Sequence, residues 1–282
     1  MIIFKKAADI GIFLQQKRQN NPKTGFVPTM GALHQGHISL IESARSENDV
    51  VVCSIFVNPT QFNDPKDFQN YPITIENDID LLEKAGCDAL FLPAVEEMYP
   101  AGLENKKPYA LGYLETVLEG RYRPGHFQGV CQVVHRLLTI VPADRLYLGQ
   151  KDFQQCMVIR KMIELENLPI ETVICPTLRE TDGLAMSSRN MRLDKEAREK
   201  AVEISRTLLH IKSSLKAGDL SELKTAAVEQ LNRTGFKTDY VEIADADTLE
   251  LIGRWDGKRK LVALCAAFLG EVRLIDNMLL QA

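Results

Sequence analysis

Short apolar runs alternate with amphipathic segments through the first 180 residues of the chain. The apolar runs lie at 24–28, 50–57, 89–92, 145–148 and 170–175. Because apolar residues fill these runs without alternating with polar ones, they are typical of strands that are covered on both faces. The predicted helices between them are 38–47, 75–85, 129–140 and 153–167. Alternating strands and helices predict a parallel sheet with right-handed crossovers, which is a Rossmann-like α/β architecture.

The pattern changes after residue 185. One long helix is expected from Asp194 to Leu215, and a second from Ser221 to Thr234. Three strand-like segments follow them at 239–244, 261–268 and 272–275. We therefore expect a Rossmann-like domain over 1–185 that binds the ligands. A smaller α+β domain that acts as a lid is expected over 186–282, with the hinge near 187–193.

Composition places the chain among ordinary soluble globular proteins, because 45% of its 282 residues are hydrophobic and 26% are charged. The formal net charge of −4 gives no electrostatic reason to expect a nucleic-acid partner. The six cysteines are scattered without a Cys-x-x-Cys pair, which argues against a metal site. There is neither a signal-peptide pattern nor an apolar run of about 18 residues, so we expect a cytoplasmic protein with no membrane partner.

The most informative stretch is Pro28–His37, with the sequence Pro-Thr-Met-Gly-Ala-Leu-His-Gln-Gly-His between a predicted strand and a predicted helix. Two histidines three residues apart at a helix start point to the same side. Glycines at 31 and 36 would let the backbone approach an anion, and a helix N-terminus attracts phosphate. A lone histidine near a turn is more often a surface or capping residue, but here the motif and its context agree.

Four further clusters follow other predicted elements and carry polar side chains. Asn58 and Gln61 follow an apolar strand, although Asn-Pro is also a common turn. Arg123 lies in a polar turn that could bind a carboxylate or phosphate, or could simply be a solvated cationic loop. The third cluster is Leu148–Gln155, and the fourth is Arg179–Asn190, which could equally be a plain interdomain linker. Together these clusters fit a nucleoside triphosphate that is attacked at its α-phosphorus.

Taken together, these motifs resemble the pantothenate synthetase (pantoate–β-alanine ligase) family of the nucleotidyltransferase superfamily. The matching segments are 28–37, 56–62, 123–134, 148–155, 182–190 and 273–277. The resemblance implies ATP-dependent joining of pantoate and β-alanine through a pantoyl adenylate, with release of pyrophosphate and AMP. It also implies Mg²⁺ with the ATP, a role in coenzyme A precursor synthesis, and a homodimer.

The resemblance further implies which residues bind ATP. His34, His37 and Lys151 would be the catalytic groups at the α-phosphate, and all three would bind ATP. The other implied ATP-binding positions are Met30, Gly31, Ala32, Leu33, Gln35, Gly36, Gly149, Gln150, Asp152, Leu178, Met186, Ser187, Ser188 and Arg189. Of these, the residues around Met30 would offer backbone amides to the triphosphate, and 187–189 would close on the phosphates.

The second substrate positions follow from the same resemblance. Gln61 and Gln155 match the glutamines that bind pantoate, and Asn58 and Arg123 would assist substrate binding. Asp78 matches a carboxylate associated with magnesium, which makes it the implied metal ligand. The chain departs from the family pattern here, because it reads Glu-Asn-Asp where some relatives carry adjacent aspartates.

A second departure lies within the helix predicted at 129–140, where Gln132 and Arg136 replace the usual Thr and Lys. We interpret this change as one of packing, and we interpret His135 and His210 as structural or surface residues. Two other functions stay open at this point. One is nucleotide transfer to a phosphate ester, and the other is nucleotide or RNA binding without turnover.

Overall fold

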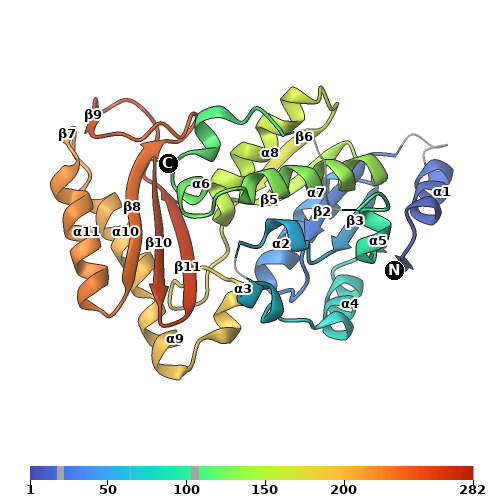
Figure 1. Ribbon diagram of the computed structural model, residues 1–282, viewed down its shortest axis with the longest axis horizontal. Coiled ribbons are helices and arrows are strands. Elements are labelled where there is room, and N and C mark those ends of the chain that lie inside the picture. The colour runs from blue at the N-terminus through green and yellow to red at the C-terminus, as the bar shows by residue number, and fades with distance from the viewer. Residues whose placement is uncertain (18–21, 64, 103–107, 282) are drawn as a thin grey trace. The chain divides into compact units, whose positions relative to one another are not determined.

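The structure is a computed structural model that describes residues 1–17, 22–63, 65–102 and 108–281 (Figure 1). These residues form two compact units, of which the first comprises 1–150 and 154–176. The second unit comprises 151–153 and 177–282. The domain boundary expected between 185 and 186 stays a prediction.

A six-stranded parallel sheet forms the centre of the first unit, in the order β1-β4-β3-β2-β5-β6. The strands are β1 (Ile2–Phe4), β2 (Thr24–Thr29), β3 (Val50–Ile55), β4 (Ala89–Phe91), β5 (Arg145–Gly149) and β6 (Glu171–Cys175). The predicted Rossmann-like parallel sheet is thus confirmed. The chain winds from β2 through β3 to β4 on one side and adds β5 and β6 on the other.

Helices cover both faces of this sheet, as the continuous apolar runs of its strands require. The longer ones are α1 (Ala7–Lys17), α2 (Gln35–Glu47), α4 (Ile75–Lys84), α7 (His126–Ile140) and α8 (Phe153–Leu165). The short helical segments are η2 (Pro59–Gln61), α3 (Pro65–Gln69), α5 (Val95–Met98), η3 (Gly112–Glu115), α6 (Glu119–Tyr122) and η4 (Gln150–Asp152).

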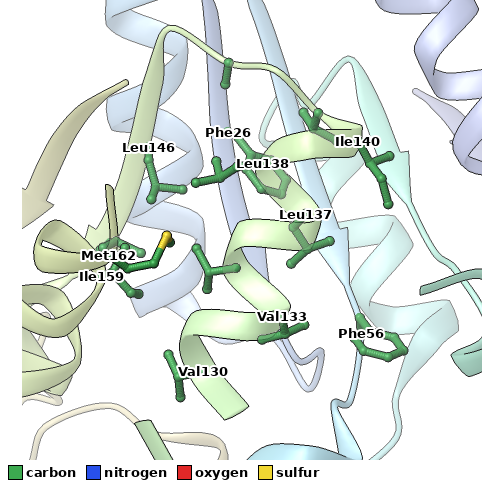
Figure 2. Close-up of a cluster of buried hydrophobic side chains, with 14 of the residues drawn as sticks. Phe26, Phe56, Val130, Val133, Leu137, Leu138, Ile140, Leu146, Ile159 and Met162 are labelled. Carbon is green, nitrogen blue, oxygen red and sulfur yellow. The ribbon is translucent and has the colours of Figure 1, made fainter. Parts of the chain in front are cut away.

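Neighbouring residues of β2 show how the two faces are filled. Phe26 belongs to a buried cluster with side chains of α1, α7 and α8, whereas Val27 belongs to another with side chains of α2 and α4. Figure 2 shows the first cluster, to which α7 contributes Val130, Val133 and Leu137. These three residues recur at the helical spacing that predicted this helix. The sheet is therefore a rigid platform for the loops at its carboxyl edge.

The second unit is a small α+β structure, as expected. Strands β8 (Lys237–Asp245), β10 (Leu261–Leu269) and β11 (Val272–Leu279) form an antiparallel sheet in the order β11-β10-β8. Helices α10 (Glu203–Ser214) and α11 (Ser221–Arg233) share one buried apolar cluster with this sheet. The remaining elements are η5 (Ser188–Arg192), α9 (Lys195–Ala201), β7 (Gly218–Asp219) and β9 (Arg254–Trp255).

Two details of the sequence-based expectation are wrong. The single helix expected from 194 to 215 is interrupted at Val202 and forms α9 and α10. Ala201 and Val202 are both buried there, so the interruption lets both helices pack against one core. Helices α2 and α7 each begin three residues earlier than expected, at Gln35 and His126.

The described residues contain no helix that is long and apolar enough to cross a membrane. All six cysteines are buried free thiols.

Candidate active site

The sheet topology itself indicates where a ligand binds. Strands β2 and β5 are neighbours, and the chain continues from them toward opposite edges of the sheet. In open α/β sheets such a switch point opens a crevice beyond the carboxyl ends of the strands. Met30 follows β2, and Gly149 ends β5, so two of the segments singled out in the sequence begin at this point.

The turn after β2 brings two imidazoles together. His34 is the N-cap of α2 and His37 lies in its first turn, with ring centroids 4.1 Å apart. The Nδ1 atom of His37 accepts a hydrogen bond from the backbone N–H of His34 at 3.3 Å. The Nδ1 atom of His34 accepts one from the N–H of Gly36 at 3.2 Å. The predicted pairing of the histidines on one side is thereby confirmed.

These hydrogen bonds fix the tautomer of both rings when they are neutral. A neutral imidazole that accepts at Nδ1 carries its proton on Nε2. Each neutral ring therefore carries an Nε2–H donor. Two such donors side by side suit negative charge that develops on a phosphate.

The backbone amides of the same turn are already used inside the protein. The N–H groups of Ala32 and Leu33 donate to the carboxylate of Asp78 at 2.9 and 2.8 Å. The N–H of Gly31 donates to the hydroxyl of Thr29 at 3.2 Å. In this structure the amides at 31–33 thus do not form an open nest for an anion.

Asn58 organises the loop after β3. It is 1% exposed, and its Oδ1 accepts from the hydroxyls of Tyr99 and Thr60 at 2.9 and 3.1 Å. Its Nδ2 donates to Gln61 Oε1 at 3.2 Å and to the carbonyl of Gly129 at 3.3 Å. Burial raises the pKa of Tyr99 above its ordinary value of 10.0, so this hydroxyl keeps its proton at neutral pH. Asn58 therefore holds Gln61, and this loop also lies against α7.

Gln61 connects three of the segments that the sequence analysis singled out. Its Nε2 lies 3.1 Å from the sulfur of Met30. Its backbone carbonyl accepts from Arg123 at 3.4 Å and lies 2.7 Å from Nδ1 of His126. Arg123 also lies 3.6 Å from the carboxylate of Glu119. Met30, Asn58, Gln61 and Arg123 are thus brought together within the first unit.

The two glutamines at the start of α8 differ in their environment. Gln154 is 3% exposed; it accepts from the N–H of Glu119 and donates to the carbonyls of Leu114 and Val117. It therefore fixes the loop before α7. Gln155 is half-buried, so its side chain is the more accessible of the two.

Lys151 is held through its backbone within the second unit. Its carbonyl accepts a hydrogen bond of 2.8 Å from Nδ2 of Asn277, a residue of β11 that is 2% exposed. The neighbouring Asp276 forms a bidentate ion pair with Arg179 at 2.6 and 3.0 Å. Arg179 also donates to the carbonyl of Asn277 at 3.1 Å. Lys151 is thus anchored to a buried, hydrogen-bonded part of β11.

The segment from Leu178 to Arg189 folds back on itself. Met186 donates its N–H to the carbonyl of Leu178 at 3.0 Å, which places these two predicted ATP-binding residues side by side. The hydroxyl of Ser187 accepts from the N–H of Arg189 at 3.3 Å and caps η5. The hydrogen bonds within this segment show that it is an ordered turn rather than the plain linker that its composition also allowed.

Asp78 lies in the first turn of α4 and is fully buried. Its Oδ1 accepts from Leu33 N–H and from the Thr74 hydroxyl at 2.8 and 2.9 Å, and its Oδ2 accepts from Ala32 N–H. Magnesium prefers octahedral oxygen ligands and retains several waters. In the part of the chain that the structure describes, no three His, Cys, Asp or Glu side chains are grouped to hold a metal. The surroundings of Asp78 therefore do not fit a magnesium ion.

Several residues of this site carried no signal that sequence reasoning could use. Tyr99 supports Asn58 from 41 positions away, in an unremarkable Met-Tyr-Pro segment. His126 and Glu119 lie near Arg123 in the sequence, but only the fold shows that His126 contacts Gln61. Asn277 lies in the matching segment 273–277, although nothing local predicts its bond to Lys151.

Comparison with known proteins agrees with this geometry. The family model described as pantoate–β-alanine ligase matches residues 2–279. Pantothenate synthetase of Cytophaga hutchinsonii is 45% identical over 283 residues, covering 99% of each chain. The pantothenate synthetase of Fervidobacterium nodosum is 46% identical and covers 95% of each chain.

Solved structures give the same result. A crystal structure of pantothenate synthetase from Thermus thermophilus matches with a TM-score of 0.92 and 42% identity, covering 100% of each chain. That of the pantoate–β-alanine ligase from Francisella tularensis, complexed with β,γ ATP and β-alanine, matches with a TM-score of 0.83 and 39% identity, covering 100% of this chain and 98% of that one. The chain belongs to the pantoate–β-alanine ligase family of enzymes.

Proposed function

We propose that the chain joins pantoate and β-alanine in two steps at the expense of ATP. In the first step, a carboxylate oxygen of pantoate attacks the α-phosphorus, the bond from that phosphorus to the β-phosphate oxygen breaks, and pyrophosphate leaves. In the second step, the amine of β-alanine attacks the acyl carbon, AMP leaves with the former carboxylate oxygen, and the nitrogen loses a proton. The product is pantothenate.

The observation that carries this proposal is the pair of imidazoles at the switch point of the sheet. The first step brings two anions together, so the site must supply positive or dipolar groups at the phosphate. His34 and His37, 4.1 Å apart at the start of α2, are such groups. Preorganised donors at a developing charge commonly contribute about 10²–10³ in rate.

The other residues of the first unit fit the binding of pantoate. Gln61 is oriented by Asn58, whose own amide is fixed because both of its polar atoms are hydrogen-bonded. Since Oε1 of Gln61 accepts from Asn58, its Nε2 is the atom that can donate to a substrate oxygen. Gln155 would supply a second amide, and Arg123 would add positive charge.

The proposal assigns phosphate and nucleotide binding to residues of 149–152 and 178–189. Lys151 would neutralise phosphate oxygens, and Ser187, Ser188 and Arg189 would supply hydroxyls and a guanidinium. Gly149, Gln150 and Asp152 would lie near the ribose, and Leu178 and Met186 near the adenine. Movement of residues 186–282 as a lid would exclude water from the adenylate, which hydrolysis would otherwise destroy.

The ligand in the Francisella ligase supports ATP and β-alanine as substrates, because that protein is 39% identical over essentially the whole chain. Mg²⁺ would enter with ATP as part of the substrate rather than as an ion held by Asp78. We also propose that the chain forms a homodimer, which light scattering on the purified protein would test.

The decisive assay supplies ATP, Mg²⁺, pantoate and β-alanine and measures pantothenate and AMP. Exchange of labelled pyrophosphate into ATP that requires pantoate but not β-alanine would support the adenylate step. A nucleotidylated product in place of AMP would point to the alternative of nucleotide transfer. ATP binding without exchange or product would leave only a binding function and would contradict the proposal.

A further inference from the structure

Asp78 is a fully buried carboxylate that lies beside the turn carrying the imidazoles. Buried carboxylates are costly unless hydrogen bonds or charges compensate them. Here the compensation comes from three donors, the N–H groups of Ala32 and Leu33 and the hydroxyl of Thr74, all within 2.9 Å. The position in the first turn of α4 adds the favourable end of the helix dipole.

The two amides belong to a turn that needs such support. Gly31 and Ala32 both have positive φ, of 83° and 50°. A left-handed conformation costs a non-glycine residue such as Ala32 about 1–2 kcal/mol. A Cβ atom on Gly31 would lie 3.0 Å from Cγ2 of Ile55 and 3.1 Å from Oδ2 of Asp78, so the chain passes close to both. The turn is therefore over-determined by its contacts with β3 and α4.

The position of this turn determines where the two imidazoles lie. Only His34 separates the bonded amide of Leu33 from the first residue of α2. The N–H of His34 donates to His37, so the two rings and the turn form one hydrogen-bonded unit. A displacement of 31–33 would therefore move both rings together.

We infer that Asp78 is a positioning residue that fixes the Gly31–Leu33 turn, and through it the imidazole pair, and that it is not a magnesium ligand. This inference rests on the proposed function for its kinetic test. Asp78 contacts neither substrate nor reacting atoms in this role. Its carboxylate acts by holding two consecutive amides at the geometry that the rings require.

Asp78→Asn is the informative variant because it preserves shape. An asparagine amide has one accepting oxygen, so its NH₂ group would face one of the N–H groups that the carboxylate now accepts. That amide would lose its partner and the turn would shift. Because a misplacement of about 1 Å can cost about 10²-fold in rate, we expect kcat to fall by about 10- to 100-fold.

Asp88→Asn is a matched control. At the amino end of β3, Oδ2 of Asp88 accepts the backbone N–H of Val51 at 2.8 Å and pairs with Arg45 at 2.9 Å. Both variants remove one carboxylate charge and preserve shape, but the single oxygen of asparagine can still accept from Val51, so Asp88→Asn should lower the temperature of thermal unfolding less than Asp78→Asn. Only Asp78→Asn should lower kcat, with the KM for ATP changed by less than about threefold, or about 0.7 kcal/mol.

Magnesium titrations distinguish positioning from metal binding. For a positioning residue, the Mg²⁺ concentration that gives half-maximal activity stays the same in Asp78→Asn, and excess Mg²⁺ restores nothing. Recovery of activity at high Mg²⁺ would show that Asp78 is a ligand and would overturn the inference. So would a folded Asp78→Asn protein with the kcat of the parent.

Two further measurements keep the inference testable if turnover or folding fails. Histidine C2 proton resonances, recorded without substrate and assigned with His34→Ala and His37→Ala, should shift in Asp78→Asn and stay unchanged in Asp88→Asn. This readout decides the positioning role even if the parent chain makes no pantothenate, a result that would count against the proposed function alone. If Asp78→Asn does not fold, Asp78→Glu keeps both accepting oxygens but moves them by one methylene away from the two amides; the same two resonances should shift, and unmoved resonances in the folded variant would overturn the inference.

Discussion

At the scale of single residues, the site depends on side chains that are held before any ligand arrives. The ring of His37 accepts from the N–H of His34, the ring of His34 accepts from the N–H of Gly36, and Gln61 accepts from Asn58. Preorganised groups of this kind do not have to reorganise as charge develops in the transition state. Avoiding that reorganisation is a main source of electrostatic rate enhancement. The hydrogen bonds that fix these side chains are thus part of the proposed catalytic function.

Substitution of a catalytic imidazole should separate activity from folding. We expect His37→Ala to lower the rate of pantoate-dependent pyrophosphate exchange by about 10²-fold or more, because it removes one preorganised donor. Lys151→Ala should do the same, while both proteins unfold at temperatures close to that of the parent. His210→Ala, at an exposed position of α10, is the control and should keep full exchange activity. A folded His37→Ala protein with normal exchange would remove the imidazole from the mechanism.

The spacing of the two histidines could be read from the sequence, because helix geometry places residues three apart on the same side. That the neighbouring amides of Ala32 and Leu33 donate to Asp78 could not be read from the sequence. Asp78 is 45 positions from Leu33 in the chain, so their hydrogen bond depends on how α4 packs beside the turn. For this reason the sequence suggested an open nest of amides where the structure has a carboxylate bound to them.

At the scale of elements, η2 and α7 determine where Gln61 lies. Gly129 of α7 packs so closely that a Cβ atom there would clash with the carbonyl of Thr60 and lie 3.1 Å from Cα of Gln61. Glycine in a helix interior normally costs stability, so its presence here reflects this close approach. The contact makes the position of the loop that carries Gln61 depend on a helix of the core.

A pair of Gly→Ala substitutions tests this close contact. Gly129→Ala should destabilise the protein by about 1–3 kcal/mol through overpacking and raise the KM for pantoate by displacing Gln61. Gly11→Ala lies within α1, where a Cβ would meet nothing within 4 Å. It should stabilise the protein by up to about 1 kcal/mol and leave the KM unchanged. Thermal unfolding and pantoate titrations of both variants check this; equal effects on KM would contradict it.

The elements that the sequence predicted are those with a clear apolar pattern. Strands β2, β3 and β5 are continuous apolar runs, and all were expected within two residues of their observed ends. Strand β1 was missed because it has three residues, of which Ile2 and Ile3 are exposed. The interruption at Val202 was also missed, because the apolar spacing continues through it.

At the scale of the whole molecule, burial keeps the thiols protonated. Burial raises the pKa of Cys87 and of Cys131 from the ordinary 9.0 to about 12, and it raises that of Cys53 well above 9.0. All six cysteines are buried, which makes them inert packing residues rather than nucleophiles. In the sequence, their scatter without a Cys-x-x-Cys pair argued against a metal site.

Alkaline pH should therefore weaken the fold. A cysteine whose pKa is raised in the folded state keeps its proton there, while the unfolded chain loses it above pH 9.0. The contribution of the protonated, buried Cys87 to the free energy of unfolding is fully present below pH 9.0 and is lost as the pH rises toward about 12. Thiol reagents should label the native protein slowly at about pH 8, below the ordinary thiol pKa, and all six cysteines after unfolding in denaturant. Rapid labelling of the native protein under the same conditions would show that a thiol is accessible and would contradict the buried assignment.

The central claim is that pantoate is activated by bonding one of its carboxylate oxygens to the α-phosphorus of ATP. The direct test uses pantoate labelled with ¹⁸O in its carboxylate, together with ATP, Mg²⁺ and β-alanine, and mass spectrometry of the products. The account predicts that AMP carries one ¹⁸O atom from pantoate for each pantothenate formed. AMP without the label, or ¹⁸O found instead in inorganic phosphate, would contradict it.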